Sequence, residues 1–484
     1  MSNTPCVARD SASLELRRIR DFGAFRLGAR ISFVLACFFA LAGFGANAGV
    51  TKMKLAGYLT ARVGEGNLMI LDDRIELSAA SKILSRDDNG EHPFKPEELA
   101  PGMLVEAEGQ WLDRHRFFPE KLTVDLRRDE RRIRGTAYLQ EEPRDAAKIA
   151  AGEASELKVD GYRLTLDAAT KRAWNVTKVS AGLPARDAAV AATLAGYHIR
   201  YSGSPSKDGR IAVEEIELGP PAPADDYKLP HNLEIVPATD PQTKIEVLEF
   251  REGKKLQGRM KLLAEHTVQE YVSHLGDSLI PEGAKGTRRP IEFRFFVVED
   301  PEINAAALPD GTVLVNSALL GVIENEAQLA FILSHEMAHV LQVHYRREIE
   351  ETRGSRVGLT IAGLAASAFI GNTGMFMAQI GIASAVNGHQ RELENQADRL
   401  GLQNVIERGY DPREASNFAR IIINRYGDRT TSKLWSNHDS SVIRGSFLMM
   451  QLIRQYPDGH WETARRNTPA FQTMKDDLGP VKIM

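Results

Sequence analysis

Short apolar runs that alternate with polar residues fill the first part of the chain, from residue 49 to about residue 218. Examples lie at 68–71, 104–107 and 211–213, and Gly, Asp and Asn residues separate such runs. A period of two, bounded by turn residues, is typical of strands with one buried face. This part of the chain is therefore predicted to be β structure.

A weak internal repeat divides this β region in two. The matching segments are 102–109 with 196–203, and 78–82 with 167–171. The first pair shares its glycine spacing, and the second pair reads Ser-Ala-Ala-Ser-Lys against Asp-Ala-Ala-Thr-Lys. We therefore expect two similar small OB-like β-barrels, at 49–128 and 129–218, with a protein-binding or spacer role.

Beyond the β region the pattern becomes helical. Segment 219–240 begins with three closely spaced prolines and is predicted to be an extended, semi-rigid linker. Residues 241–450 are expected to form a mainly helical domain with a strand pair at 293–298 and Thr312–Asn316, followed by a C-terminal extension at 451–484. The predicted fold class is α+β, with a mainly helical domain and a small sheet after two barrels.

One helix in this domain has a strongly apolar pattern and is predicted at 326–345. Neither Pro nor Gly interrupts it, and its apolar residues recur three and four positions apart: Leu329, Ile332, Leu333, Val340 and Leu341. A second apolar stretch, 357–386, is interrupted at 371–374, and each half is too short to span a bilayer. It could pack in the core, lie on a membrane surface, or contact a partner such as an outer-membrane assembly factor.

The first 48 residues differ from the rest. An Arg-rich segment precedes an apolar run at 31–45, which ends in Ala46-Asn47-Ala48. This order is typical of a secretory signal, and the apolar run is short for a membrane span. We expect residues 1–48 to be a cleaved signal peptide that exports the protein to the periplasm; an uncleaved anchor that leaves it membrane-associated is the alternative.

Composition and charge restrict the function. The chain has 43% hydrophobic and 26% charged residues, as a folded soluble protein does. Cleavage would remove six Arg, three acidic residues and both cysteines, which changes the net charge from −4 to −7. An acidic chain without a basic aromatic face is not expected to bind nucleic acid. Without cysteine, His and carboxylate side chains would have to hold any metal.

The predicted helix at 326–345 carries His335-Glu336-Met337-Ala338-His339. Two imidazoles four residues apart lie on one face of a helix, and both can reach a single Zn²⁺ at about 2.0–2.1 Å. Glu336 is placed to accept a proton from a water molecule that the metal activates. A surface or core pair of histidines would be the simpler alternative, but an apolar helix would leave these groups without partners.

A third ligand is expected on a second helix. Glu394 and Asp398 are four residues apart and share a helix face. One of them can bind the metal while the other holds a ligand imidazole by its far nitrogen.

These residues resemble those of metallopeptidase family forty-eight, the gluzincins that include HtpX, the CAAX prenyl protease and OMA-type proteases, and in particular its periplasmic quality-control type. The resemblance covers about residues 240–450. It rests on Asn304-Ala-Ala-Ala-Leu-Pro-Asp-Gly311, His335-Glu-Met-Ala-His339, Glu394-Asn-Gln-Ala-Asp398 and Gly409-Tyr-Asp-Pro412. It implies one zinc ion per chain with Glu394 as the third ligand and Asp398 in the supporting position, and it gives Glu392 no role.

The resemblance also implies two further residues near the substrate. The family has a His-Pro segment with an Arg six residues after the His, and His438 and Arg444 have this spacing, although Asp439 replaces the Pro. His438 is then a candidate to stabilise the transition state or to approach the metal, against an ordinary surface histidine. Arg444 would support the site. His344 is expected on the helix surface or beside a ligand.

The predicted function is that of a zinc metalloendopeptidase. Peptidases of this type hold an extended substrate against a sheet edge, which by resemblance is Thr312–Asn316 or its pairing partner. Such binding suits protein or peptide substrates, and here unfolded or misassembled envelope proteins. The alternative function is a chaperone-like scaffold for envelope proteins, with latent or secondary proteolysis.

Overall fold

The computed structural model describes residues 53–64, 66–128, 133–175, 194–229, 232–285, 291–348, 391–426 and 441–483 of the 484-residue chain. All of these residues except Met53 belong to one unit, Lys54–Met484. Three predicted features lie outside the described residues: the signal at 1–48, the apolar segment 357–386, and His438.

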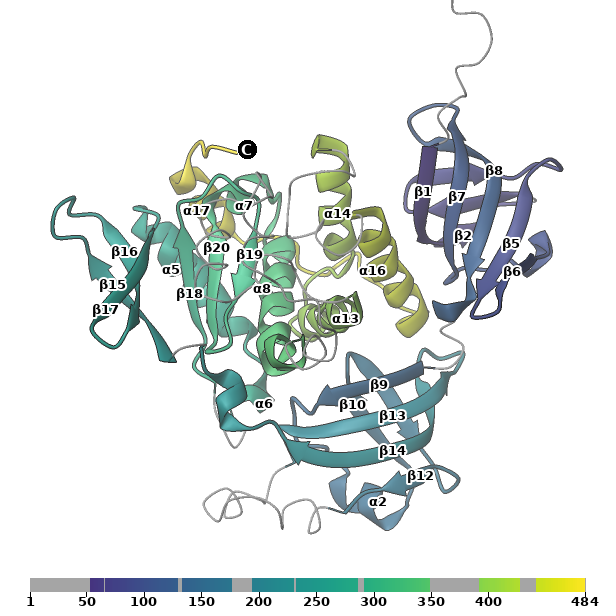
Figure 1. Cartoon of the computed structure of the whole chain (residues 1–484), viewed down its shortest axis with the longest axis horizontal. Coiled ribbons are helices and arrows are strands. Elements are labelled where there is room, and N and C mark those ends of the chain that lie inside the picture. The colour runs from purple at the N-terminus through teal and green to yellow at the C-terminus, as the bar shows by residue number, and fades with distance from the viewer. Residues whose placement is uncertain are drawn as a thin grey trace, which may run out of the picture. The chain divides into compact units, whose positions relative to one another are not determined.

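The first β region forms one sheet (Figure 1). Its strands are β1 (Met53–Tyr58), β2 (Ala61–Arg62), β3 (Asn67–Ile70), β4 (Asp73–Glu76), β5 (Lys82–Asp87), β6 (Gly90–Pro93), β7 (Leu104–Trp111) and β8 (Arg116–Asp125). The strand order is β1-β7-β8-β4-β3-β2, and β5 pairs with β8 and β6. Alternate apolar residues such as Leu68, Ile70 and Phe117 fill its core, as the period of two predicts.

The second β region has a core and a sheet of its own. It comprises β9 (Ile133–Tyr138), the short helix α2 (Ala146–Ala151), β10 (Ser155–Val159), β11 (Tyr162–Leu166), β12 (Lys171–Ala173), β13 (Tyr197–Pro205) and β14 (Ile211–Pro221). The order is β10-β11-β14-β13-β9, and β12 also pairs with β14. Leu164, Ile199 and Ile216 lie in its buried core.

The two β regions share a pairing scheme that the sequence repeat anticipates. In each, an antiparallel hairpin (β7–β8 or β13–β14) presents its second strand to two parallel partners, β4 and β5 in one region and β11 and β12 in the other. The register of both hairpins shifts at the matching glycines, Gly109 and Gly203. Both regions are therefore β structure of similar topology, and their OB-like closure stays a prediction.

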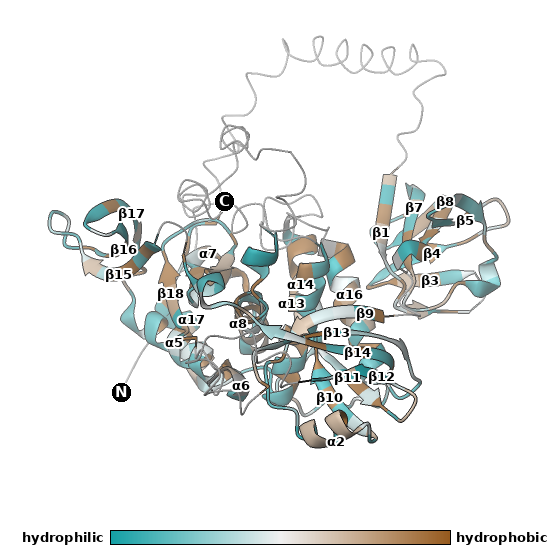
Figure 2. Cartoon of the chain, turned by 60° about the horizontal axis from the view of Figure 1, so that its bottom comes forward, coloured by the Kyte–Doolittle hydropathy of each residue, from teal (hydrophilic) through white to brown (hydrophobic). Residues whose placement is uncertain are grey.

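Two further sheets follow. The strands β15 (Leu233–Thr239), β16 (Glu246–Glu252) and β17 (Lys255–Lys261) form an antiparallel sheet in that order. The predicted strand pair is present as β18 (Arg294–Val298), which is largely hydrophobic in Figure 2, and β20 (Thr312–Asn316). The two run parallel, and β19 (Ala305–Ala307) pairs with β20 on its other side, antiparallel.

This strand order corrects one expectation. Thr312–Asn316 lies between β18 and β19 and all five of its residues are buried, so β20 itself cannot accept a substrate strand. The predicted pairing partner, β18, ends the described sheet on one side, and β19, which the sequence did not predict, ends it on the other. Of these two edges, β19 lies on the side that contacts α8 (Glu326–Leu341). The expectation for β20 is therefore wrong, and the edge that would bind substrate stays a prediction.

The remaining helices pack around this sheet. They are α5 (His266–Leu279), α6 (Glu282–Lys285), α7 (Ser317–Val322), α13 (Arg391–Glu407), α14 (Arg413–Tyr426), α16 (Ser441–Gln455) and α17 (Pro469–Leu478). The largest core cluster joins α5, β18, β20, α8, α14 and α17, and α8 is buried along its whole length. Together with the β regions this is a mixed α and β fold, consistent with the α+β class.

The described helix α8 is shorter than predicted. It ends at Leu341, and Val343 then takes a positive φ of 47°, which is unusual for a β-branched residue. The local pattern continues to Tyr345, but Gln342 uses its side-chain amide to bind the backbone N–H and C=O of Tyr138 in β9. A tertiary contact thus accompanies the break, and residues 344–348 resume as a separate helical segment.

Two predicted boundaries fall inside elements. Strand β14 continues to Pro221 and β15 starts at Leu233, so regular structure enters both ends of the expected linker 219–240. Position 450 lies within α16, and α17 packs into the core cluster of the preceding domain. Among the described residues, no helix is both long and apolar enough to cross a bilayer.

Corresponding turns of the two β regions approach the helices. The β3–β4 turn contains Leu71, with φ of 53°, and an ideal Cβ on Gly445 of α16 would lie 3.1 Å from the Leu71 Cδ1. The β10–β11 turn contains Asp160 and Gly161, with φ of 58° and 71°. A Cβ on Gly161 would lie 2.5–2.8 Å from Arg399 of α13, so only glycine permits this approach.

Candidate metal centre

Close packing of α13 on α8 builds the centre. On α13, Glu394, Asp398 and Gly401 lie on one face because they are four and seven residues apart. Gly401 has no side chain, and a Cβ there would lie 3.2 Å from the backbone nitrogen of His335. This contact holds both carboxylates of α13 against the histidines of α8.

Three side chains that the sequence predicts as ligands come together here. The Nε2 atoms of His335 and His339 lie 3.0 Å apart. The Glu394 carboxylate has Oε2 at 3.5 Å from the His335 Nε2 and Oε1 at 3.7 Å from the His339 Nε2. All three side chains are buried, and no other such group of His, Cys, Asp and Glu occurs within the described stretches.

The donor set fits a zinc ion. Two ligands at about 2.0–2.1 Å in tetrahedral geometry lie roughly 3.3 Å apart, and the three observed separations bracket this value. Two imidazoles and one carboxylate leave a fourth position open, which is the composition of catalytic rather than structural zinc sites. The identity of the ion stays a prediction.

Asp398 and Arg444 support the first histidine. The Asp398 Oδ1 lies 3.0 Å from the His335 Nδ1, so the carboxylate holds the ring by the nitrogen that faces away from the donors. Arg444 donates from Nη2 and Nε to the two oxygens of Asp398, at 2.6 and 3.2 Å. Its Nη1 lies 3.4 Å from the Glu394 Oε2. The structure therefore brings Asp398 and Arg444 into the centre.

The electrostatics keep both carboxylates ionised. Burial by itself raises the pKa of Glu394, but the opposing effect of His339, His335 and Arg444 holds it well below its usual range. Burial likewise opposes ionisation of Asp398, yet Arg444 and His335 lower its pKa. For His335, burial disfavours the charged ring, but hydrogen bonds with Asp398 and Glu394 outweigh it and raise the pKa to about 9. The site is arranged to hold positive charge.

Glu336 follows the first histidine on α8 and is 6% exposed. One residue along a helix is a turn of about 100°, so its carboxylate flanks the histidine face. Burial lowers the pKa of the Arg444 guanidinium, but Asp398, Glu394 and Glu336 together raise it. Glu336 thus belongs to the same cluster of charges.

The second histidine has a support that sequence reasoning did not identify. Its Nδ1 lies 2.9 Å from the Nδ1 of His344, and the Nε2 of His344 lies 2.9 Å from the Oε1 of Gln396. The break after α8 makes this possible, because it turns the buried His344 back toward the centre. Of the two positions predicted for His344, the one beside a ligand agrees with the structure. Gln396 lies within the Glu394–Asp398 segment, but the sequence analysis gave it no role.

One other residue considered in the sequence analysis lies away from the three donors. Glu392, which the resemblance does not make a ligand, is exposed on α13 and lines a pocket next to the second β region. His438 lies outside the described residues.

Comparison with known proteins places this centre in a recognised domain. Residues 266–454 match the family described as Peptidase family M48. The match extends from the start of α5 almost to the end of α16 and includes all three donors, Glu336, Asp398 and Arg444. It excludes both β regions.

Several named proteins are similar to about a third of this chain. The Beta-barrel assembly-enhancing protease of Yersinia pestis is 30% identical over 172 residues, which are 34% of this chain and 35% of that protein. The Escherichia coli K12 protein of the same name is 29% identical over 185 residues, which are 36% of this chain and 37% of that protein. The Mitochondrial metalloendopeptidase OMA1 of Schizosaccharomyces pombe is 28% identical over 172 residues, which are 32% of this chain and 49% of that protein. The chain thus spans about a third to a half of the length of these relatives.

Proposed function

Because residues 266–454 form a peptidase family M48 domain, we propose that this chain is a zinc-dependent endopeptidase that hydrolyses unfolded or misassembled envelope proteins. The observation that carries the proposal is the convergence of two imidazole nitrogens and one carboxylate within 4.8 Å of one another. His335, His339 and Glu394 would hold the ion. When bound there, Zn²⁺ polarises a scissile carbonyl and lowers the pKa of a water molecule.

In this proposal Glu336 moves the proton. Its carboxylate accepts a proton from the attacking water and delivers it to the leaving amine, which makes it the general base and then the general acid. Its burial beside the histidines keeps bulk water away from the transfer.

The remaining charged residues hold the geometry. Asp398 fixes the orientation of the His335 ring, and Arg444 fixes Asp398 through two hydrogen bonds. The same guanidinium lies near the Oε2 of Glu394. By the family resemblance, His438 is a candidate to stabilise the oxyanion.

The substrate would bind as an added strand on β19. The backbone N–H of Leu308 donates to the Thr312 C=O and the Asn304 C=O accepts from the Asn316 N–H, so these positions face β20. Because strand positions alternate, the N–H and C=O groups of Ala305 and Ala307 face the opposite way. An extended chain could pair with them through its backbone, which gives little sequence preference.

The substrate class follows from the predicted export signal together with the relatives. Two of those relatives have names that refer to β-barrel assembly. A periplasmic enzyme of this kind would meet unfolded or misassembled envelope chains. Segment 357–386 is the candidate region for a membrane-surface or assembly contact.

The test is degradation of an unfolded reporter protein by the purified chain from residue 49 onward. Glu336→Gln is the matched variant, because it changes the proton acceptor and leaves all three donors in place. We expect at least about 100-fold slower cleavage with unchanged zinc content. Equal cleavage by both proteins would overturn the mechanism. A zinc-loaded parent that retains the reporter without cutting it would favour the scaffold function.

A further inference from the structure

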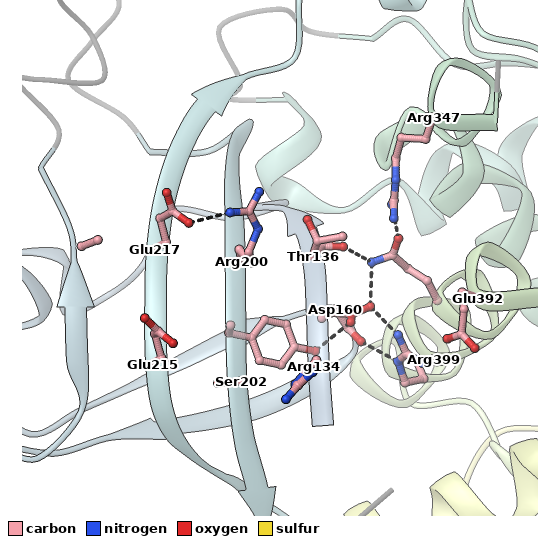
Figure 3. A pocket seen from close by; sticks show the side chains of 14 residues that line it. Arg134, Thr136, Asp160, Arg200, Ser202, Glu215, Glu217, Arg347, Glu392 and Arg399 are labelled. Carbon is pink, nitrogen blue, oxygen red and sulfur yellow. Dashed lines mark hydrogen bonds and ion pairs between the residues drawn. The ribbon is translucent and has the colours of Figure 1, made fainter. Parts of the chain in front are cut away.

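The β10–β11 turn of the second β region reaches the helix that carries Glu394. The Oδ1 of Asp160 accepts from the Nη2 of Arg399 at 2.7 Å, and the Asp160 C=O accepts from Nε at 3.0 Å. Asp160 is 3% exposed and Arg399 is 9% exposed, so this ion pair is buried. Figure 3 shows the two side chains next to each other, joined by dashed lines, among the residues that line the pocket.

Asp160 also has a donor within its own β region. The hydroxyl of Tyr201 in β13 donates to the Oδ2 of Asp160 at 2.7 Å. Burial and the adjacent carboxylate raise the pKa of Tyr201 well above its usual value, so the hydroxyl keeps its proton. The carboxylate is thereby held from both sides and acts only as an acceptor.

This arrangement fixes the amide of Gln396. Its Nε2 donates to the Asp160 Oδ1 at 2.7 Å and to the Thr136 C=O of β9 at 3.0 Å. A carboxylate and a backbone carbonyl can only accept, so the amide nitrogen must point toward the second β region and the amide oxygen away from it. Arg347 supports this orientation by donating to that oxygen at 2.6 Å.

The amide orientation determines the tautomers of two histidines. Because the Gln396 Oε1 only accepts, the Nε2 of His344 must carry a hydrogen. In a neutral ring the Nδ1 of His344 is then an acceptor, so the Nδ1 of His339 must donate. The Nε2 of His339 then has a free lone pair, which points toward the other two candidate metal ligands, His335 and Glu394.

We propose that Asp160 and Gln396 are positioning residues for the metal ligand His339, so that the second β region completes the metal centre. The inference rests on the proposed function, because it needs a metal at His339. It assigns a role to a region outside the family match. Partners of ligand imidazoles outside the donor set typically change metal affinity 10- to 100-fold.

A pocket borders this network of hydrogen bonds. The pocket has a volume of about 930 Å³ and is lined by Gln396 together with Thr136, Asp160, Arg347 and Arg399. Gln396 is nevertheless only 3% exposed. Two acceptors on the second β region and one donor on 344–348 hold its buried amide.

The experiment measures the zinc dissociation constant by competition with a chromophoric chelator, and the absorption spectrum of the cobalt-substituted chain. The variants are Gln396→Leu, Asp160→Ala and the double variant, with Asp160→Asn as the conservative change. An Asn oxygen can still accept from Gln396 and Arg399. The matched control is Asp72→Ala, which removes the Asp72–Arg420 contact between the corresponding turn of the first β region and α14.

We expect both single variants to bind zinc 10- to 100-fold more weakly with altered cobalt spectra. The double variant should bind zinc about as tightly as the single variant with the lower zinc affinity, because both changes break the same chain of hydrogen bonds. Asp160→Asn should recover most of the affinity, and Asp72→Ala should match the parent. If Asp160→Ala does not fold, Gln396→Leu and Asp160→Asn carry the test.

The positioning role would be overturned if Gln396→Leu and Asp160→Ala bound zinc within twofold of the parent's affinity and kept its cobalt spectrum. In that case, a parent that binds zinc and cleaves its reporter would leave the proposed function intact. A parent that binds no zinc would remove both proposals. A loss of affinity in Asp72→Ala equal to that in Asp160→Ala would also contradict the inference, since it would be a general effect of loosened packing.

Discussion

The two β regions present corresponding turns to the helical domain, and each turn places an aspartate against an arginine of a helix. In the first region Asp72 meets Arg420 of α14, and the two side chains are 45% and 39% exposed. In the second region Asp160 meets Arg399 of α13, and the side chains are 2% and 10% exposed. The corresponding turns therefore make an exposed ion pair in the first region and a buried hydrogen-bond network in the second.

The difference lies in what surrounds each pair. In the β10–β11 turn, Gly161 permits a close approach to the backbone of α13. In the corresponding β3–β4 turn, the side chain of Leu71 packs beside Gly445. Asp160 gains Tyr201 and Gln396 as further donors, and that network continues to His339. A repeated fold thus sets where a turn points, while a few side chains decide whether the contact has a chemical consequence.

The largest expected effect is on Asp160. Asp160→Ala leaves the Arg399 guanidinium buried without its counter-charge, and breaking a buried pair in this way costs about 3–5 kcal/mol of stability. Denaturant unfolding, together with hydrogen exchange of the β10 and β11 amides, measures the loss. Asp160→Asn also removes the charge but keeps an oxygen that can accept hydrogen bonds, so it separates the loss of the counter-charge from the loss of the acceptor. If Asp160→Ala lowered the free energy of unfolding by less than about 1 kcal/mol, Asp160 would contribute no more than Asp72. The contrast between a buried and an exposed contact would then be wrong.

The bulge glycines test what the two regions share. A Cβ would lie 2.0 Å from the Phe118 carbonyl oxygen in Gly109→Ala and 2.3 Å from the Ala212 carbonyl oxygen in Gly203→Ala. Both variants must push the hairpin strands apart, at about 1–3 kcal/mol each. Thermal unfolding should show losses that agree within about 1 kcal/mol. A loss in only one region would mean that the shared topology does not carry equal constraints.

The smallest expected effect is on Asp72. Exposed ion pairs contribute at most about 1 kcal/mol and are screened by salt. Asp72→Ala should therefore lower stability slightly at low ionic strength, and the difference from the parent should vanish near 1 M salt. Unfolding curves at two salt concentrations measure this. A large loss that persists in high salt would show that the first turn is a structural contact as strong as the second.

Local sequence patterns predicted a good part of this structure. The period of two found both β regions, and the glycine repeat identified strands with the same pairing and the same bulge. The spacing of His335 and His339, with a carboxylate pair on a second helix, was enough to expect the cluster that the structure contains. Such features follow from periodicity and ligand chemistry within short segments.

The features that were not predicted depend on contacts between distant segments. β20 is central because the chain turns back after β19 and inserts β20 between β18 and β19. The end of α8 depends on Gln342 binding β9, which no pattern within the helix reveals. Gln396 and Asp160 are 236 positions apart, and although Gln396 lies within the Glu394–Asp398 segment, nothing in the sequence connects it with Asp160. Only the folded chain brings these residues together.

The central claim is that His335, His339 and Glu394 together bind one zinc ion. Zinc content per chain, measured in the parent, in Glu394→Ala and in Glu392→Ala, tests it most directly, because Glu392 is an exposed neighbour on the same helix. We predict one zinc per chain in the parent and in Glu392→Ala, and little or none in Glu394→Ala after dialysis. Full zinc content in Glu394→Ala, or none in the parent, would contradict the account.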